Sequence, residues 1–313
     1  MCKKYIFIKL CGLLLSLPVL AGIEVTDDAG HSIRLESPAR RILSLAPHVT
    51  ENLFSIGAGE LIVGTVSYSD YPPEALSIPR IGNYERISLE QALALAPDLV
   101  IAWPPGNDAV QLQRLRDFGI PVFESDPNSF DDIALHLRRL GRLTGRDETA
   151  ERTARELEAR VGTLAAQHRD AAPVRVFYQL WHEPLMTVNG SQLVGRMLRL
   201  CGGRNSFAEQ SEVAPRLGVE AVLAAMPEVI VTTTEEAPAD WRERWRRWPQ
   251  LPAVQLDLFY QLEADWMHRA TLRAVDGAEQ LCRDLDDARE KLGYGAAGAG
   301  ARQPAVDRNG EAN

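Results

Sequence analysis

The stretch EQALALAPDLVI at positions 90–101 decides the fold, because its pattern recurs as EAVLAAMPEVIV at positions 220–231. Each copy reads as a short helix, a proline-acid turn and a buried strand, which is a common unit of α/β proteins. The two copies are 130 positions apart (220 − 90). One match of this kind is weak by itself, so the prediction of a duplicated fold needs a second one.

A second pair of segments supports the same duplication. Arg41 leads an apolar strand pattern that ends at His48, and Arg175 leads one that ends at His182, at the similar offset of 134 (175 − 41). Apolar runs alternate with helical patterns in both halves, with strands at 41–46, 61–66, 98–103, 120–123, 175–180, 229–233 and 253–258, and helices at 88–95, 129–143, 193–200, 219–225 and 268–290. The sequence therefore predicts an α/β fold of two Rossmann-like lobes with a ligand cleft between them.

Residues 147–168 separate the two halves and predict one long amphipathic helix. Apolar positions recur there at alternating steps of four and three, and charged residues fill the other face. A helix of about 22 residues measures about 33 Å, and a single helix is a stiff connection. We predict a rigid linking helix within residues 146–172, between an amino-terminal lobe at 22–145 and a carboxy-terminal lobe at 173–292.

The two ends of the chain differ in composition from the lobes. Residues 1–21 combine three lysines with an apolar run that is short for a membrane span, so they predict a secretory signal peptide, with a membrane anchor as the alternative. Residues 293–313 are rich in Gly and Ala without apolar periodicity and predict a disordered tail. The signal peptide predicts an exported protein.

The charge of the chain argues against nucleic acid as a partner. The formal net charge is −9, and removal of residues 1–21, which hold three lysines and no acid, changes it to −12 (−9 − 3). An acidic surface repels nucleic acid. No later stretch is long and apolar enough to cross a membrane, so we expect no direct membrane insertion.

Two of the four cysteines, Cys201 and Cys282, remain after residue 21. An even number in an exported protein favours one disulfide bond, and two buried free thiols are the alternative. A closed loop of about 80 residues contributes roughly 4–5 kcal/mol to stability through chain entropy.

Aromatic side chains follow the predicted strands, at the positions where α/β proteins bind ligands. Any single one is more typical of a core residue, but several at strand ends indicate a site for a large, flat, partly apolar ligand. The candidates in the first half are Tyr68, Tyr84 and Trp103, and those in the second half are Trp181 and the segment Asp265, Trp266, Met267 and His268.

The sequence gives less support to a metal site or to catalysis. His48, His182 and His268 fall near strand ends and offer a metal or iron-porphyrin site, with hydrogen bonds to the backbone as the alternative. The three histidines lack the close spacing that is typical of metal ligands, so no metal site is predicted. Nucleophile-elbow, phosphate-cradling and zinc-protease motifs are absent from the sequence, and we expect neither an enzyme nor a cofactor.

Glu90 and Glu220 occupy the same position at the start of the two repeated helices. A carboxylate there interacts favourably with the helix dipole and helps to cap the helix, which is one explanation for both. The alternative uses their equivalence. One glutamate on each lobe would let the protein dock on a two-fold symmetric partner that presents two arginine clusters.

Several stretches resemble the cobalamin receptors of bacterial vitamin uptake, which are helical-backbone solute-binding receptors of ABC importers. The similarity runs from about Arg41 to Asp286 and is most specific in SYSDYPP at 67–73, APDLVIAW at 96–103, LCGG at 200–203 and QLC at 280–282. It implies a corrinoid held by Tyr68, Tyr84, Trp103 and residues 265–268, a disulfide between Cys201 and Cys282, and contacts of Glu90 and Glu220 with permease arginines.

The chain departs from the family pattern in its second lobe. Met267 and His268 replace a phenylalanine and a glutamate, residues 181–183 replace a smaller Gly-Ile-Asn, and Ala214 stands where a pocket tryptophan is expected. These differences leave the wall of the second lobe, and with it the identity of the corrinoid, open.

We therefore expect a monomeric periplasmic solute-binding protein that captures cobalamin or a related corrinoid. Its further partners would be the permease subunits of an ABC importer, to which it delivers the ligand. A haem or iron-siderophore receptor of the same fold is the second candidate, and an exported enzyme is the third.

Overall fold

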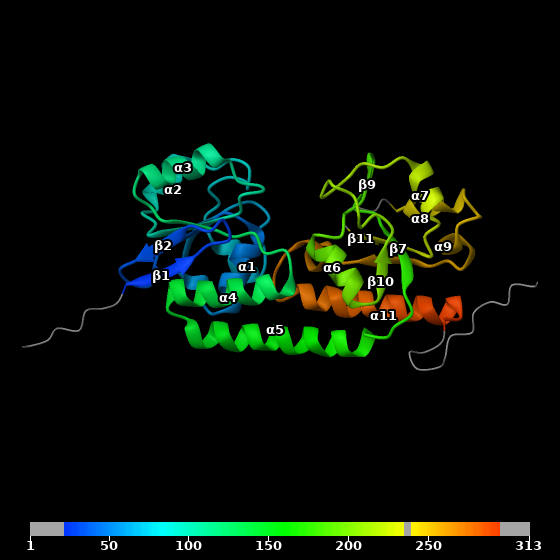
Figure 1. The fold of residues 1–313 in the computed structure, drawn as a ribbon. Coiled ribbons are helices and arrows are strands. Elements are labelled where there is room, and N and C mark those ends of the chain that lie inside the picture. Colours follow the sequence, from blue (N-terminus) through cyan, green and yellow to red (C-terminus); the bar gives the residue numbers. More distant parts are fainter. Residues whose placement is uncertain (1–21, 235–238, 295–313) are drawn as a thin grey trace, which may run out of the picture.

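The structure, a computed structural model, describes residues 22–234 and 239–294. The predicted signal peptide at 1–21 and nearly all of the predicted tail at 293–313 lie outside these residues. The described chain forms two α/β lobes that stand on one long helix (Figure 1). No described helix combines the length and apolar character that a membrane span requires.

The amino-terminal lobe is built on a parallel sheet in the order β4-β3-β5-β6. The strands are almost wholly buried, as expected for a parallel sheet covered on both faces. They are β3 (Ile42–Ser44), β4 (Ile62–Thr65), β5 (Leu99–Ala102) and β6 (Val122–Glu124), and an antiparallel hairpin of β1 (Ile23–Thr26) and β2 (Ser32–Leu35) lies outside the sheet. The helices are α1 (Pro47–Ser55), α2 (Leu89–Ala94), α3 (Ala109–Asp117) and α4 (Phe130–Thr144), with 3₁₀ turns η1 (Gly59–Leu61) and η2 (Pro73–Ser77).

The carboxy-terminal lobe repeats this sheet in the order β10-β7-β11-β12, again all parallel. Its strands are β7 (Val174–Tyr178), β10 (Gly203–Asn205), β11 (Val229–Thr233) and β12 (Phe259–Leu262), with a separate hairpin of β8 (Trp181–His182) and β9 (Leu185–Met186). Its helices are α6 (Leu193–Leu200), α7 (Val219–Ala225), α8 (Trp241–Arg246), α9 (Pro252–Gln255), α10 (Ala264–His268) and α11 (Ala274–Leu292). The order of equivalent strands is the same in both lobes, which confirms the predicted two-lobed α/β fold.

The duplicated sequence makes the same contacts in both lobes. Arg41 Nε donates to the carbonyl of Ala96 at 3.1 Å, and Arg175 Nε donates to the carbonyl of Met226 at 3.2 Å. Ala96 and Met226 both take the left-handed conformation that ends a helix, with φ of 43° and 46°. Each arginine therefore caps the helix of its own repeat, because the last carbonyls of a helix lack partners within it.

The linking helix α5 (Asp147–His168) runs beneath both lobes and packs against α4 and α11 (Figure 1). Its bounds are those of the predicted amphipathic segment. Of the predicted apolar face, Val161 and His168 are only partly buried, while the residues that are buried are Ala150, Ala154, Leu157 and Leu164, and Thr153 is buried in addition. The largest hydrophobic cluster continues from β3 and β5 through α5 to β7 and β11. A shared core thus joins the lobes in addition to α5.

The prediction of a strand at 253–258 is wrong. The segment begins in α9, which has Pro252 at its first position, and the strand of the sheet follows at β12. Proline is well suited to the first turn of a helix because its missing N–H would have no partner there. Residues 253–258 therefore form a short helical turn and the approach to β12, with Ala253 and Leu258 buried and residues 255–257 exposed.

The predicted helix at 268–290 is interrupted. α10 ends at His268 and α11 begins at Ala274. Between them the chain turns towards the other lobe, where the Asn52 side chain donates to the carbonyl of Ala270 at 3.0 Å. This contact crosses between residues far apart in the sequence, which is why local periodicity misses the break.

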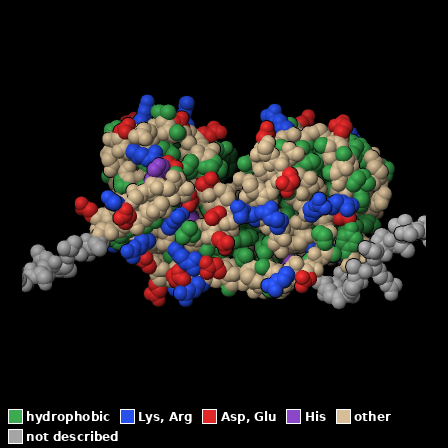
Figure 2. Space-filling model, viewed as in Figure 1, with side chains coloured by type: hydrophobic (Ala, Val, Ile, Leu, Met, Phe, Trp, Pro, Cys, Tyr) green, Lys and Arg blue, Asp and Glu red, His purple; other side chains and the backbone are tan. Residues whose placement is uncertain are grey.

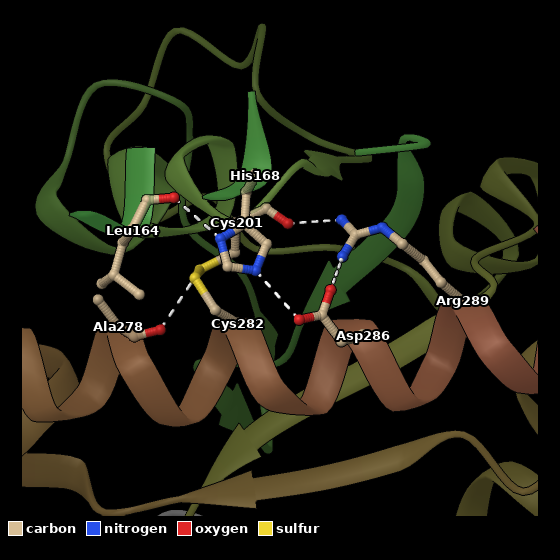
Figure 3. The surroundings of a disulfide bond; sticks show 7 residues. All are labelled: Leu164, His168, Cys201, Ala278, Cys282, Asp286 and Arg289. Carbon is tan, nitrogen blue, oxygen red and sulfur yellow. Dashed lines mark hydrogen bonds and ion pairs between the residues drawn. A yellow bond between two sulfur atoms is a disulfide. The ribbon is translucent and has the colours of Figure 1, made fainter. Parts of the chain in front are cut away.

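The predicted disulfide between Cys201 and Cys282 is present and joins the end of α6 to α11 (Figure 3). Both cysteines are buried. Beside them, Asp286 pairs with His168 of α5 at 3.1 Å and with Arg289 at 2.7 Å. The disulfide therefore lies at the junction of α5, α6 and α11.

Candidate ligand-binding site

The two lobes face each other across a hollow that opens on the side away from α5 (Figures 1 and 2). Since the strands of each sheet are parallel, the loops that follow them gather at one edge. One of these loops reaches the other lobe, because Asp70 Oδ1 lies 2.9 Å from Arg269 Nη1. The loops after the strands therefore meet at this hollow, which we call the cleft.

Trp103 and Tyr84 form an aromatic wall on the amino-terminal lobe, with ring centroids 6.0 Å apart. Asn107 holds both loops, since its Nδ2 donates to the carbonyl of Tyr84 and its Oδ1 accepts from the N–H of Trp103, each at 2.6 Å. A Cβ atom at Gly106 would lie only 2.3 Å from the Trp103 ring, so glycine is required there. Both aromatic rings remain partly exposed and are available to a ligand.

Tyr68 follows β4 and has 70% of its surface exposed. Its φ angle is 66°, in the left-handed region that a bulky residue rarely adopts. Backbone outliers of this kind concentrate at ligand sites, where the strain serves to aim a side chain. Tyr68 lies two residues before Asp70, which contacts the other lobe, so it stands at the junction of the lobes.

Three buried polar groups, His48, Ser125 and His136, lie behind Trp103. His48 packs edge-on against the Trp103 ring at 6.0 Å. Ser125 Oγ lies 3.4 Å from His48 Nε2 and 3.3 Å from His136 Nε2. Burial lowers the pKa of His48 to about 4 and that of His136 to about 3. Both rings are therefore neutral at neutral pH and support the wall from inside the lobe.

Trp181 stands on the β8–β9 hairpin of the carboxy-terminal lobe and is 41% exposed. Its Nε1 donates to the carbonyl of Glu183 at 3.0 Å, and its ring stacks on His182 at 6.1 Å. His48 follows β3, and His182 follows the equivalent strand β7. His48 is buried, whereas His182 lies on the exposed β8–β9 hairpin. The repeat therefore does not extend to the cleft walls.

Asp265 and Trp266 lie on the short helix α10, and both are partly exposed. The Asp265 carboxylate pairs with Arg269 at 2.8 Å and with Arg273 at 3.3 Å. The two arginines fix the position of this carboxylate at the base of the cleft.

His268 ends α10, with its Nε2 2.8 Å from the hydroxyl of the buried Tyr178. The residue as a whole is exposed, yet burial of the ring by the surrounding protein lowers its pKa to about 4. These two properties together are expected for a group on the wall of a cleft. Met267 is different, because it is fully buried in the core, and its side chain therefore leaves the candidate contact set.

The described residues do not bring His48, His182 and His268 together as a set of metal ligands. A different group does have ligand atoms within 4.8 Å of one another, at the β1–β2 hairpin, and consists of Asp27, His31 and Glu124. Its atoms already accept backbone hydrogen bonds and an ion pair from Arg116. These bonds explain the group as part of the hairpin's packing.

The sequence did not point to the ion pairs that join the lobes at the cleft. Glu51 of α1 binds Arg273 at 2.7 Å and accepts a hydrogen bond from Thr271 at 2.7 Å. Nothing in the local pattern of α1 marks Glu51 as buried. Asp70 had one signal, since it lies in the family-like stretch 67–73.

Glu90 and Glu220 lie in the first turns of α2 and α7, and both are exposed. α2 and α7 stand on different lobes and on the same side of the molecule, away from α5 (Figure 1). This arrangement leaves both carboxylates free to meet a partner that covers the open side of the cleft.

Residues 42–265 match the family described as periplasmic binding protein. The chain belongs to this family. The vitamin B12-binding protein of Vibrio cholerae serotype O1 is 38% identical over 255 residues, which are 81% of this chain and 92% of the relative. A protein of the same name from Photorhabdus laumondii subsp. laumondii is 37% identical over 247 residues, or 79% and 88% of the two chains.

Solved structures agree with this family assignment. The periplasmic vitamin B12 binding protein of Vibrio cholerae superimposes with a TM-score of 0.75 and 37% identity, over 81% of this chain and 99% of that one. A periplasmic heme-binding protein from Roseiflexus has a TM-score of 0.71 and 26% identity, over 80% and 99%. The comparisons confirm the predicted family and fold, and they show that a vitamin B12-binding protein and a heme-binding protein share this architecture.

Proposed function

We propose that this family member captures a corrinoid, cobalamin or a close relative, in the cleft and releases it to an ABC importer without making or breaking bonds. The observation that carries the proposal is the partly exposed ring pair Trp103 and Tyr84 on one lobe. On the other lobe, Trp181 is exposed and Trp266 is partly exposed. The named function of the relatives at 37–38% identity supports the same ligand.

The residues around the cleft suit the chemistry of a corrinoid. Flat, partly exposed rings bury the faces of a large macrocycle and keep their polar edges available. Asp265 and the Tyr68 hydroxyl would accept hydrogen bonds from the amide side chains at the macrocycle rim. These contacts bind and orient a ligand non-covalently. Such binding requires no pair of a nucleophile and a general base.

The deciding experiment is isothermal titration calorimetry with cyanocobalamin, cobinamide and haemin. We expect saturable binding of a corrinoid, and a loss of about tenfold or more in affinity for Trp103→Ala, because buried aromatic contacts dominate binding energy. Trp248→Ala is the matched control, since Trp248 packs against Trp245 within the carboxy-terminal lobe. Absence of heat with both corrinoids would contradict the proposal.

A haem is the second candidate ligand, because two exposed side chains at the cleft, Tyr68 and His268, are of the types that ligate haem iron. An iron-siderophore would use the same cleft. Haemin that binds with a shifted Soret band, lost in Tyr68→Phe or His268→Gln, would favour haem over the corrinoid.

For delivery, we propose that Glu90 and Glu220 meet arginines of the importer's permease subunits. Their exposure, their equivalent positions on the two lobes and their location on the cleft side support this role. Charge pairs of this kind steer association and fix register. Delivery requires a periplasmic location, with residues 1–21 as the export signal, and the buried disulfide suits that oxidising compartment.

A further inference from the structure

A cluster of five charged side chains spans the two lobes at the base of the cleft. Three are carboxylates and two are guanidinium groups, and the side chains of Glu51, Arg269 and Arg273 are only 5%, 14% and 17% exposed. We call these five residues the interlobe cluster, and they are Glu51, Asp70, Asp265, Arg269 and Arg273. The inference drawn from it rests on the proposed function, since it concerns how the cleft is held for a ligand.

Glu51 is the centre of the cluster on the amino-terminal lobe. Its two carboxylate oxygens accept from Nε and Nη2 of Arg273, both at 2.7 Å, in a two-bond pairing. The Thr271 hydroxyl adds a third bond at 2.7 Å. Bidentate bonds between charged groups are strong and strongly directional, so they fix the orientation of Arg273 relative to α1.

Arg269 is the centre on the carboxy-terminal lobe, and it connects two candidate ligand-binding segments. Its Nε binds Asp265 at 2.8 Å, and its Nη1 binds Asp70 of the opposite lobe at 2.9 Å. Asp70 belongs to the loop that presents Tyr68. One arginine therefore holds a carboxylate of one wall and a tyrosine loop of the other.

Arg273 makes the same kind of double connection. Its guanidinium lies 3.7 Å from the ring centre of Tyr71, which follows Asp70 in the loop, and it also binds Asp265 at 3.3 Å. A cation over an aromatic face is attracted to the ring, and partial burial strengthens that attraction. Tyr68, Asp70 and Tyr71 are thus tied to the opposite lobe through two arginines.

The burial of these charges makes the arrangement selective for one lobe spacing. A buried charge is costly unless its partners are in place, and loss of one partner leaves the other uncompensated. If the lobes moved apart, Glu51 would lose Arg273 while Asp70 would lose Arg269. The charges therefore favour the one spacing at which all of them are paired.

We propose that Glu51, Arg269 and Arg273 are positioning residues for the corrinoid, because they hold Asp265 and the loop of Tyr68 at a fixed distance across the cleft. They act through Asp265 and through the spacing of the lobes. The alternative is a cluster that contributes to stability alone.

The test compares Glu51→Gln and Arg273→Gln with Arg160→Gln. Arg160 pairs with Asp276 at 2.6 Å and with Glu279 at 2.9 Å on α11, so it is a matched arginine with two acidic partners. It belongs to α5, which lies on the side of the molecule away from the cleft (Figure 1). Thermal unfolding should shift in all three variants. Calorimetry with cyanocobalamin should show an affinity about tenfold weaker in the first two variants only. Wild-type affinity in both would overturn the proposal.

A double-mutant cycle separates positioning from general destabilisation. If Arg273 acts in part through Asp265, the combination of Asp265→Asn with Arg273→Gln should weaken cyanocobalamin binding by less than the product of the two single losses. A loss equal to the full product would show that Arg273 acts independently of Asp265, and that result would count against the proposed route.

A distance measurement keeps the inference testable if no corrinoid binds even the wild-type protein, an outcome that would reject the proposed function alone. Double electron-electron resonance measures the lobe spacing between two spin labels. We place them at Gln113→Cys and Ala224→Cys, which are exposed and lie on different lobes. The buried disulfide cysteines are not labelled. The distance distribution should broaden in Glu51→Gln and stay narrow in Arg160→Gln. Equal distributions would reject a role in spacing.

Discussion

In both lobes a parallel sheet carries the same helix-proline-acid turn, and the arginine that leads the first strand caps the helix, as Arg41 and Arg175 do. The walls built on these sheets differ. The amino-terminal wall is a pair of rings held by Asn107, while the carboxy-terminal wall stands on a two-stranded hairpin and the one-turn helix α10.

The difference shows which part of a duplicated sequence is constrained. The ends of helices and strands have carbonyl and N–H groups that need partners in any lobe, so the residues that satisfy them repeat. The loops that face the cleft do not have to meet this shared requirement of the backbone. Their sequences can therefore differ between the lobes without disturbing the sheets and helices. A two-lobed receptor therefore gains an asymmetric site from a symmetric framework.

The disulfide is the largest difference in covalent structure, since it closes a loop within the carboxy-terminal lobe and residues 22–145 contain no cysteine. Replacement of Cys201 and Cys282 by serine should lower the free energy of unfolding by about 4–5 kcal/mol at most, because the unfolded chain regains loop entropy. Urea titration measures this loss, and hydrogen exchange locates it.

Hydrogen exchange also sharpens the comparison of the lobes. Amides of α6 and α11 should exchange faster in the serine variant, while those of β3 and β5 keep their protection. Equal acceleration in both lobes would show that they unfold as one unit through the hydrophobic cluster that they share.

Histidines with lowered pKa values make the stability of both lobes depend on pH, and the amino-terminal lobe contains two of them, His48 and His136. The folded pKa values of His48 and His136, about 4 and about 3, lie below the unfolded value of about 6.5. Between about pH 6.5 and 4 the unfolded chain therefore binds protons that the folded chain does not. Stability is fully present above that window and falls as the pH is lowered through it.

Replacement of His136 by glutamine removes one of these groups. The slope of unfolding free energy against pH should then decrease by about 1.4 kcal/mol per pH unit within the window. His268→Gln in the other lobe should decrease the slope by a similar amount, because the pKa of His268 is also lowered to about 4. Urea titrations from about pH 4.5 to 7.5 measure both. An unchanged slope in either variant would contradict the lowered pKa of that histidine.

Much of the framework could be predicted from the sequence. The linking helix, α6 and α7 have the predicted bounds, because their apolar positions follow the helical period. The central strands β5 and β11 read as apolar runs, because both faces of a parallel sheet are covered. The disulfide followed from an even number of cysteines and from the family resemblance.

The features that the sequence did not reveal depend on contacts between distant segments. Glu51 is buried only because Arg273, 222 positions later, pairs with it. The break after His268 exists because residues 269–273 turn to meet α1. Met267 was placed in the site by resemblance, yet packing in this chain turns it into the core. A local pattern carries no information on which of these distant pairs will form.

The smallest expected effect tests whether the two lobes are equivalent towards the importer. Glu90→Ala and Glu220→Ala should each weaken binding to the cognate importer in lipid nanodiscs by about fivefold, the value of one exposed charge pair of about 1 kcal/mol. The double variant should show the product of the two effects, because well-separated sites act independently.

Glu156→Ala with Glu290→Ala, exposed on α5 and α11, is the matched control. Cyanocobalamin affinity should not change in any variant, since neither helix start carries a candidate ligand contact. If one glutamate accounted for the whole loss of importer binding in the double variant, the importer would contact only that lobe. The equivalent carboxylate on the other lobe would then only stabilise the start of its own helix.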